Sequence, residues 1–293
     1  MIVKIGKTAG FCGGMKRAVS KAEEIVEKEK HIYCLGELAH NRQVMDKLEN
    51  KGMQVISDIG ELKPGSSVIL RAHGVKKQIY DEIKRRQLVM IDLTCPKVSK
   101  IHEMVENYAK QGKYIFLLSE KGHPETIGTF SFAGQNIFLL EDISQVDEAI
   151  EVWRKSFKKE IVVISQTTFS MTKFDEIAQE VKRKLKGEEV KVDIQKTICD
   201  ATRNRQEETK RLSQEVDFMC VIGGENSSNT HKLYEIAKKY CKKAIWIQSK
   251  EQLKKDSFEG ATIIGVMAGA STPKESIEDI VRKIKEIKKE KKE

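Results

Sequence analysis

The sequence predicts an α/β protein of three small units, each with a mainly parallel four-stranded sheet, in a pseudo-threefold, trefoil-like arrangement around a central site. Three observations lead to this prediction. Short apolar segments typical of buried strands alternate with helical patterns along the chain. A strand that leads into a cysteine and then into a helix occurs three times, at Cys12, Cys95 and Cys199. Polar loops follow several strands, and such loops form the ligand-binding edge of a parallel sheet.

The first unit is expected between Cys12 and Cys95. Its predicted elements are a helix at 18–26, a strand at 31–36, a helix at 44–48, strands at 53–56 and 67–70, a helix at 79–83 and a strand at 88–92. Two of the strands are followed by polar loops, and these loops contain His40 and His73. Both histidines are therefore expected at the carboxyl edge of the sheet.

The second unit repeats this plan between Cys95 and Cys199. Its predicted elements are a helix at 98–111, strands at 114–118 and 137–140, a helix at 146–157, a strand at 161–164, a helix at 174–185 and a strand at 190–194. Polar loops are expected at residues 119–126 and 165–168. The first of these loops again carries a histidine, His123.

The third unit is predicted to take its last strand from the N-terminus. Its own segment supplies a helix at 203–214, strands at 218–222, 244–247 and 261–266, a helix at 274–287, and polar loops at 223–231 and 267–273. It lacks a strand leading into a cysteine, whereas the N-terminal strand lacks a unit of its own. The predicted division is therefore 1–13 completing the third unit, 14–95, 96–195, 196–281, and a basic tail at 282–293.

Composition predicts a cytoplasmic protein with reduced cysteines. No stretch of the 293 residues approaches the roughly 20 apolar residues of a membrane span. The N-terminus lacks the apolar core of a signal peptide. Six cysteines in such a chain are expected to be thiols, some of which bind a metal.

The net charge of +9 raises the possibility of nucleic-acid binding. Much of this excess comes from the lysine-rich segment 282–293, and such a segment is usually a solvated helix end. Aromatic residues make up only 6% of the chain, and no nucleic-acid recognition motif occurs. Nucleic acid is therefore the least favoured class of partner.

The equivalent positions of Cys12, Cys95 and Cys199 indicate a metal site. Each is expected at a helix N-terminus, where unpaired N–H groups and the helix dipole stabilise a thiolate. Zinc bound by three cysteines and an iron–sulfur cluster with one open position both fit this set of ligands. A non-catalytic three-cysteine metal-binding module is the alternative to an enzyme. The remaining cysteines, Cys34, Cys220 and Cys241, fall in apolar segments or at a helix end and are assigned to packing.

A ring of hydrogen-bond donors is expected around one pocket. Its members are polar residues of the predicted loops: His40, His73, His123, Ser227, Ser228, Asn229 and Ser271. Such a set of donors suits a diphosphate or another oxyanion. Because no Walker loop or GxGxxG motif occurs, a nucleotide is not indicated.

Glu125 is the best candidate for a proton donor. It is the carboxylate in the turn His123-Pro124-Glu125-Thr126 and could protonate a leaving hydroxyl group. Capping of the following helix is an equally good explanation for an acidic residue there. Thr167 and Thr168 could bond substrate or relay protons, or could cap a helix.

Nine motifs in one order give the chain a resemblance to a known family. They are Gly10-Phe11-Cys12, Leu38-Ala39-His40-Asn41, Ala72-His73-Gly74-Val75, Asp92-Leu93-Thr94-Cys95-Pro96, Gly122-His123-Pro124-Glu125, Ser165-Gln166-Thr167-Thr168, Ile198-Cys199-Asp200-Ala201-Thr202, Asn226-Ser227-Ser228-Asn229 and Ala268-Gly269-Ala270-Ser271. The chain resembles the 4-hydroxy-3-methylbut-2-enyl diphosphate reductase (LytB) family, which acts last in the methylerythritol phosphate route to isoprenoids. Gly13-Gly14 and Arg71 depart from the family pattern.

The resemblance implies a function for each candidate residue. Cys12, Cys95 and Cys199 would hold a [4Fe-4S] cluster whose open iron binds the substrate hydroxyl. The seven donors of the ring would hold the diphosphate, and Glu125, aided by Thr167 or Thr168, would deliver protons. The products would be isopentenyl and dimethylallyl diphosphate. Ferredoxin or flavodoxin would supply electrons to a monomer or homodimer, and the basic surface suits an acidic donor.

Overall fold

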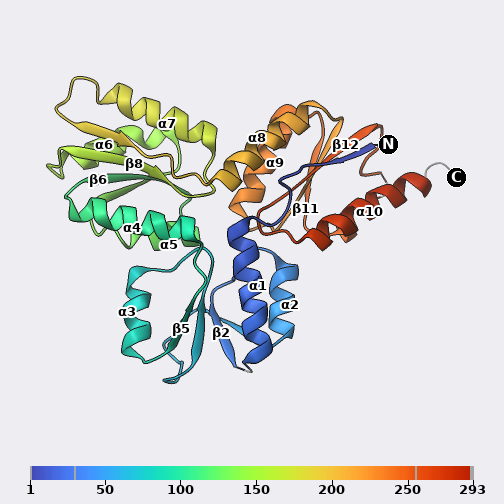
Figure 1. The fold of residues 1–293 in the computed structure, drawn as a ribbon. Coiled ribbons are helices and arrows are strands. Elements are labelled where there is room, and N and C mark those ends of the chain that lie inside the picture. Colours follow the sequence, from blue (N-terminus) through green and yellow to red (C-terminus); the bar gives the residue numbers. More distant parts are fainter. Residues whose placement is uncertain (1, 30, 255, 291–293) are drawn as a thin grey trace. The chain divides into compact units, whose positions relative to one another are not determined.

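The computed structural model describes residues 2–29, 31–254 and 256–290. Three four-stranded sheets account for the strands of the described residues, and every strand pair is parallel. Helices connect the strands and cover the sheets (Figure 1). The predicted fold class, an α/β protein with three parallel four-stranded sheets, is confirmed.

The first sheet contains the N-terminal strand together with the three last strands of the chain. Its strand order is β1 (Ile2–Ile5), β12 (Ile263–Ala268), β10 (Phe218–Ile222) and β11 (Ala244–Ile247). The N-terminal strand is thus an edge strand beside β12, with Ile2 opposite Ile263. Helices α8 (Asp200–Gln214) and α9 (Ser228–Tyr240) pack on one face through Leu212 and Leu233, and α10 (Lys274–Glu290) packs on the other.

The second sheet is formed by the strands between Cys12 and Cys95. Its order is β3 (Met53–Ile56), β2 (Ile32–Leu35), β4 (Ser67–Leu70) and β5 (Val89–Asp92). The helices of this segment are α1 (Gly13–Lys28), α2 (Arg42–Asn50) and α3 (Lys77–Arg85). Ile83 of α3 packs on Val68 and Leu70 of the central strand β4.

The third sheet has the order β7 (Ile137–Leu140), β6 (Tyr114–Leu118), β8 (Glu160–Ser165) and β9 (Lys191–Ile194). Its helices are α4 (Pro96–Lys110), α5 (Pro124–Phe130), α6 (Val146–Arg154) and α7 (Met171–Lys184). Alternate residues of β6 face opposite ways, as a β-strand requires. Phe116 packs toward α6 and α7, whereas Ile115 packs toward α4. A sheet covered on both faces explains why its strands are apolar throughout.

The three sheets share one plan. In each, the strand that leads to a cysteine lies at an edge, next to a central strand: β1 beside β12, β5 beside β4, and β9 beside β8. The repeat of strand, cysteine and helix seen in the sequence therefore corresponds to equivalent places in three sheets.

Two predicted loops are shorter than expected because helices begin inside them. The loop predicted at 119–126 ends where α5 begins at Pro124, and the loop predicted at 223–231 ends where α9 begins at Ser228. The reason is local: His123 and Ser227 are N-cap residues whose side chains accept backbone N–H groups of the first helical turn. The helix predicted at 146–157 ends at Arg154, and Phe157 has a positive φ of 56°.

The contacts within the chain divide it into two compact units. Unit 1 contains the N-terminal residues through Val19, the segment Ala39–Lys47 and the chain from Asp200 onward, and unit 2 contains the rest. The division into three units with the predicted boundaries stays a prediction.

In the segment predicted as a basic tail, residues 282–290 continue α10, and residues 291–293 lie outside the described part. Within the described residues, no helix has both the length and the apolar character needed to cross a membrane.

Candidate active site

Each of the three candidate metal ligands is held by the same backbone hydrogen bond. The amide of Cys12 donates to the carbonyl of Ala270, that of Cys95 to Ala72, and that of Cys199 to Thr167, at 3.0 to 3.1 Å. The three acceptors all lie just after the central strand neighbouring the cysteine's own edge strand. Because the sheets share one plan, the three thiols are presented in the same way.

All three cysteines immediately precede or cap a helix. Cys95 is the N-cap of α4, with Pro96 as the first helical residue, and Cys12 and Cys199 directly precede α1 and α8. The sulfur of Cys12 accepts the amide of Met15 at 3.4 Å, so the helix N-terminus already provides a donor to this thiol.

The exposure of the six cysteines separates them into two groups. All six are thiols, and Cys12, Cys95 and Cys199 are partly exposed. Cys34 and Cys220 are buried in strands, and Cys241 is buried at the C-cap of α9, which confirms their assignment to packing. Burial raises the pKa of Cys34 and of Cys220 to about 12, so neither is suited to act as a thiolate ligand.

The candidate ligands are distributed over both units. Cys12 belongs to unit 1, whereas Cys95 and Cys199 belong to unit 2. Among the residues that the structure describes, no three His, Cys, Asp or Glu side chains form a group that could hold a metal ion. The case for a metal centre therefore rests on two observations. Thiols are good metal ligands, and the three cysteines occupy equivalent positions in their sheets.

Glu125 and Thr167 are brought into direct contact. The amide of Thr167 donates to one carboxylate oxygen of Glu125 at 2.7 Å, and the hydroxyl lies 2.6 Å from the other. Glu125 is only 2% exposed. Burial raises the pKa of Glu125 to about 7, although the two hydrogen bonds from Thr167 act in the opposite direction. A carboxyl group that titrates near neutrality can both hold and release a proton at physiological pH.

A buried network fixes this pair in place. The Ser119 hydroxyl bonds the Gln166 side-chain oxygen at 2.9 Å and the Thr126 hydroxyl at 2.5 Å. The Gln166 amide nitrogen donates to the Thr168 hydroxyl at 2.8 Å. These bonds join the start of α5 to the loop after β8, and so hold Glu125 against Thr167. Sequence reasoning missed Ser119, Thr126 and Gln166 as supports, although Gln166 lies inside a quoted motif.

His73 and His123 lie together, and the geometry assigns a tautomer to His123. Their rings meet edge to face with centroids 5.6 Å apart. The Nδ1 atom of His123 accepts the amide of Glu125 at 3.1 Å, so Nδ1 is unprotonated and the proton of the neutral ring is on Nε2. In this tautomer the ring N–H group that can donate a hydrogen bond is Nε2–H.

His102 is a core residue of helix α4. Its ring is 3% exposed and stacks on Phe132 with centroids 4.4 Å apart. A Cβ atom at Gly74 would lie 2.6 Å from the ring, and one at Gly128 would lie 3.3 Å from it. Gly74 directly follows His73, and Gly128 lies in α5 three residues after Glu125, so the ring fills the space that these two glycines leave. Burial lowers the pKa of His102 to about 4 and keeps the ring neutral.

Three elements of unit 1 meet around His40. The Ser271 hydroxyl donates to the carbonyl of His40 at 3.3 Å. Gly224 approaches the same carbonyl so closely that a Cβ atom would collide with it. The loops after β2, β10 and β12 thus bring the predicted residues His40 and Ser271 together, and Gly224 is a support that sequence reasoning missed.

The N-cap and the first turn of α9 contain three of the predicted donors. Ser227 caps the helix, and its hydroxyl accepts from the amide and hydroxyl of Thr230 at 3.2 and 2.9 Å. Ser228 and Asn229 follow, and Asn229 is 4% exposed. The oxygen and the nitrogen of the Asn229 side chain are both buried without a hydrogen-bond partner. Since a buried amide is costly without partners, this side chain is suited to a ligand that completes its bonds.

Replacement of Asn229 by Ala is expected to weaken diphosphate binding without lowering the stability of the fold. The change removes a buried amide that makes no hydrogen bond in the chain, so the melting temperature is expected to stay close to that of the parent. Affinity for inorganic diphosphate, measured by calorimetry, is expected to fall about tenfold, as for a lost hydrogen bond to a charged group. Asn107→Ala on the exposed surface of α4 is the matched control. Unchanged affinity would remove Asn229 from the binding site.

Comparison with known proteins identifies the family. The family model described as LytB protein matches residues 3–285. The chain belongs to the LytB family. Two curated relatives named 4-hydroxy-3-methylbut-2-enyl diphosphate reductase come from Caldanaerobacter subterraneus subsp. tengcongensis and Aquifex aeolicus. The first is 37% identical over 98% of both chains, and the second is 38% identical over 97% of this chain and 96% of its own.

Solved structures show the same relationship. The E-1-hydroxy-2-methyl-but-2-enyl-4-diphosphate reductase from Plasmodium falciparum matches with a TM-score of 0.88 and 30% identity, over 96% of this chain and 87% of its own. A structure of (E)-4-hydroxy-3-methyl-but-2-enyl diphosphate reductase matches with a TM-score of 0.68 and 36% identity, over 98% of this chain and all of its own. The resemblance predicted from the nine motifs is confirmed, and the chain is an enzyme of a reductase family.

Proposed function

We propose that this protein is a 4-hydroxy-3-methylbut-2-enyl diphosphate reductase that forms isopentenyl and dimethylallyl diphosphate. The observation that carries the proposal is the buried Glu125–Thr167 pair, found in a chain whose relatives are named as this reductase. A reductive dehydroxylation needs a proton donor for the leaving hydroxyl group, and this pair provides one. A module that only binds a metal has no use for a buried carboxyl group that titrates near neutrality.

The thiols of Cys12, Cys95 and Cys199 are the proposed ligands of a [4Fe-4S] cluster. They suit it because they are partly exposed and equivalent in their backbone bonding, whereas the other three cysteines are buried. Three thiolates leave one iron without a protein ligand. When bound, this group would supply single electrons and a Lewis acid for the C–O bond.

The diphosphate is proposed to bind the seven donors of the predicted ring. The tautomer of His123 supports this role, because it places the ring proton on Nε2, a nitrogen that can donate a hydrogen bond to a phosphate oxygen. The unsatisfied amide of Asn229 supports it independently, since a bound oxyanion would accept from its nitrogen. His40, His73, Ser227, Ser228 and Ser271 complete the proposed set.

Proton delivery is assigned to Glu125 with Thr167. In the reaction the C–O bond breaks, the hydroxyl group leaves as water, and two electrons and two protons enter. The protonated carboxyl of Glu125 can donate to the Thr167 hydroxyl 2.6 Å away, which in turn can pass its own proton to the leaving oxygen. Thr168 is held by Gln166 instead, so contact with Glu125 favours Thr167 as the relay.

An anaerobic assay tests the proposal. Protein purified without oxygen is supplied with a reduced dye and 4-hydroxy-3-methylbut-2-enyl diphosphate, and dye oxidation and products are followed together. The expected result is one product molecule, isopentenyl or dimethylallyl diphosphate, for each two electrons consumed. Absence of both products from iron-loaded protein would overturn the proposal.

Three expectations about the protein's partners and place stay predictions. They are ferredoxin or flavodoxin as the natural electron donor, a monomeric or homodimeric state, and a cytoplasmic location.

A further inference from the structure

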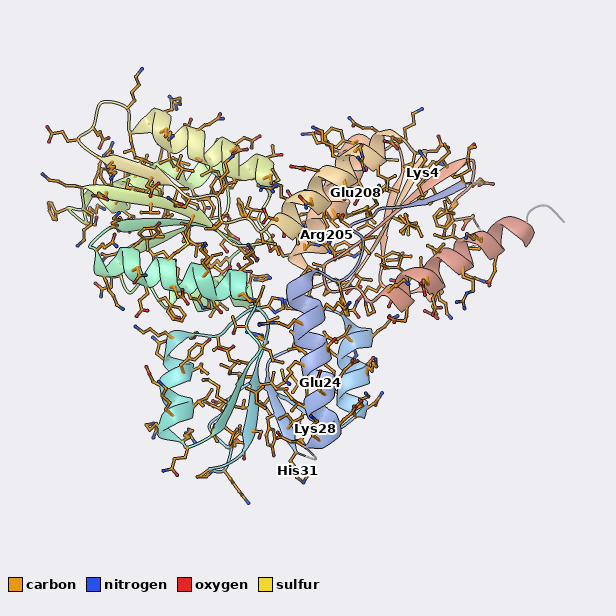
Figure 2. All side chains as sticks on the ribbon, viewed as in Figure 1. Lys4, Glu24, Lys28, His31, Arg205 and Glu208 are labelled. Atoms are coloured by element: carbon orange, nitrogen blue, oxygen red, sulfur yellow. The ribbon has the colours of Figure 1, made fainter. Side chains whose placement is uncertain are left out.

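The segment that leads to Cys12 runs along helix α8. Lys4 forms an ion pair with Glu215, which directly follows this helix, at 3.3 Å. Further along the segment, Glu208 accepts hydrogen bonds from Thr8, and Arg205 donates to Gly10. Lys4, Arg205 and Glu208 are labelled in Figure 2, which shows the strand beside the helix.

Glu208 holds residues 7 and 8 by three hydrogen bonds. Its carboxylate accepts the amide of Lys7 at 2.8 Å, and the amide and the hydroxyl of Thr8 at 2.7 and 2.5 Å. Burial opposes the charge of Glu208, yet the bonds from Thr8 and Lys7 hold its pKa below the ordinary value. The carboxylate is therefore ionised at neutral pH, and bonds to an ionised acceptor are stronger than neutral ones.

Arg205 holds Gly10, two residues before Cys12. Its guanidinium donates to the carbonyl of Gly10 at 2.5 Å and to that of Ala201, on its own helix, at 2.8 Å. The side chain is 4% exposed, so this connection is inside the protein. A planar guanidinium can make both bonds at once, which a lysine ammonium cannot do in the same geometry.

The packing around the segment leaves it little freedom. Gly10 has φ of 96°, a left-handed conformation, and a Cβ atom there would lie 3.0 Å from Ile277. A Cβ atom at Gly6 would collide with Met267. The segment is therefore enclosed by α10 and β12 as well as being bonded to α8.

The contacts between this segment and α8 run in order along the helix. As the segment proceeds from Lys4 to Gly10, its partners move from Glu215 to Arg205, toward the N-terminal end of α8. Helix α8 begins at Asp200, the residue after Cys199. The bonds thus hold the Cys12 segment to the helix that follows a second proposed ligand.

We propose that Arg205 and Glu208 are positioning residues that hold Cys12 ready to bind the metal cluster. The inference rests on the proposed function, because it takes Cys12 to be a ligand. Cys12 lies in a loop between β1 and α1, and ordering such a loop costs conformational entropy if binding must do it. Because the segment is already ordered by α8, the cluster is retained more firmly.

The test compares two neighbouring glutamates of α8. Glu208→Gln leaves only one acceptor oxygen for Lys7 and Thr8, whereas Glu207→Gln alters an exposed carboxylate on the same helix. Each protein is purified anaerobically with its iron, and loss of visible absorption is followed after addition of an iron chelator. Glu208→Gln is expected to lose its cluster about tenfold faster than the parent, as for other supports of metal ligands. Glu207→Gln is expected to match the parent.

Two further measurements keep a folding defect apart from a positioning effect. The rates are measured well below the melting temperature of each variant, with native secondary structure verified by circular dichroism. Thr8→Val removes only the hydroxyl bond to Glu208, and Arg205→Lys weakens the hold on Gly10. Both are expected to give intermediate rates and a changed electron paramagnetic resonance signal of the reduced cluster.

The outcomes distinguish this inference from the proposed function. Equal rates for Glu208→Gln and Glu207→Gln, in proteins that carry their iron, would overturn the positioning role and leave the reductase intact. A parent protein that takes up no iron–sulfur cluster would overturn both.

Discussion

Glu125→Gln is expected to lower turnover of the allylic diphosphate by about 10²- to 10⁴-fold, the usual contribution of a general acid. Gln is close to Glu in shape and can keep one bond to Thr167, but it has no proton to deliver. Diphosphate binding is assigned to other residues, so KM is expected to change little. Steady-state kinetics with a reduced dye measures both quantities. Unchanged turnover would remove Glu125 from the proposed proton delivery.

The pH dependence of the reaction rate provides a second test of Glu125. Glu125 must be protonated to act as an acid, and its pKa is raised to about 7 by burial. The rate limited by proton delivery is therefore expected to be level below pH 7 and to fall as pH rises above it. The residual activity of Glu125→Gln is expected to lack this alkaline fall. Glu103→Gln, an exposed change on α4, is the control and is expected to keep the profile of the parent.

Matched variants distinguish the roles of Thr167 and Thr168. Thr167→Val removes the hydroxyl bonded to Glu125, whereas Thr168→Val removes the hydroxyl bonded to Gln166. If Thr167 relays the proton, its replacement is expected to lower turnover more than that of Thr168. The Thr167 hydroxyl also lowers the pKa of Glu125, so Thr167→Val is expected to move the alkaline limb to higher pH.

Cys95→Ser is expected to abolish the iron–sulfur centre. A hydroxyl is a poor replacement for a thiolate, and the two remaining thiolates are insufficient to retain the cluster. Protein prepared without oxygen is expected to be brown for the parent and almost colourless for the variant, with a matching loss of bound iron and of reductase activity. Cys34→Ser, which changes a buried packing residue, is the control for iron content.

Metal analysis of the parent protein decides between the two metal hypotheses. Stoichiometric zinc in a colourless parent protein would refute the cluster, because zinc cannot carry electrons. Iron and sulfide in the parent, with full retention in Cys95→Ser, would instead remove Cys95 from the ligand set.

Much of the fold could be predicted because its signals are local. The apolar run of β8 and the alternation of strands with helices indicate a parallel sheet without reference to distant residues. Recurrence of the strand and cysteine at Cys12, Cys95 and Cys199 indicated three equivalent sheets, and their shared backbone bonds agree with that expectation. The helix starts at Pro124 and Ser228 were missed because polar residues such as Ser227 are typical of loops and of N-caps alike.

The interactions that define the candidate site could not be predicted in the same way. Glu125 and Thr167 are 42 positions apart, and Arg205 bonds Gly10 across 195 positions. Pattern and spacing contain no information about such pairs until the strands are placed in order. For this reason sequence reasoning left capping and catalysis equally favoured for Glu125, and left Thr167 and Thr168 undistinguished.

The sequence by itself determined the class of fold, the three cysteines at strand ends and the family to which the chain belongs. These follow from local periodicity and from short motifs. Only the tertiary structure decided which threonine meets Glu125, which ring nitrogen of His123 accepts the Glu125 amide, and what holds the segment before Cys12. The physical reason is that burial and hydrogen bonding depend on atoms that the fold brings together from distant parts of the chain.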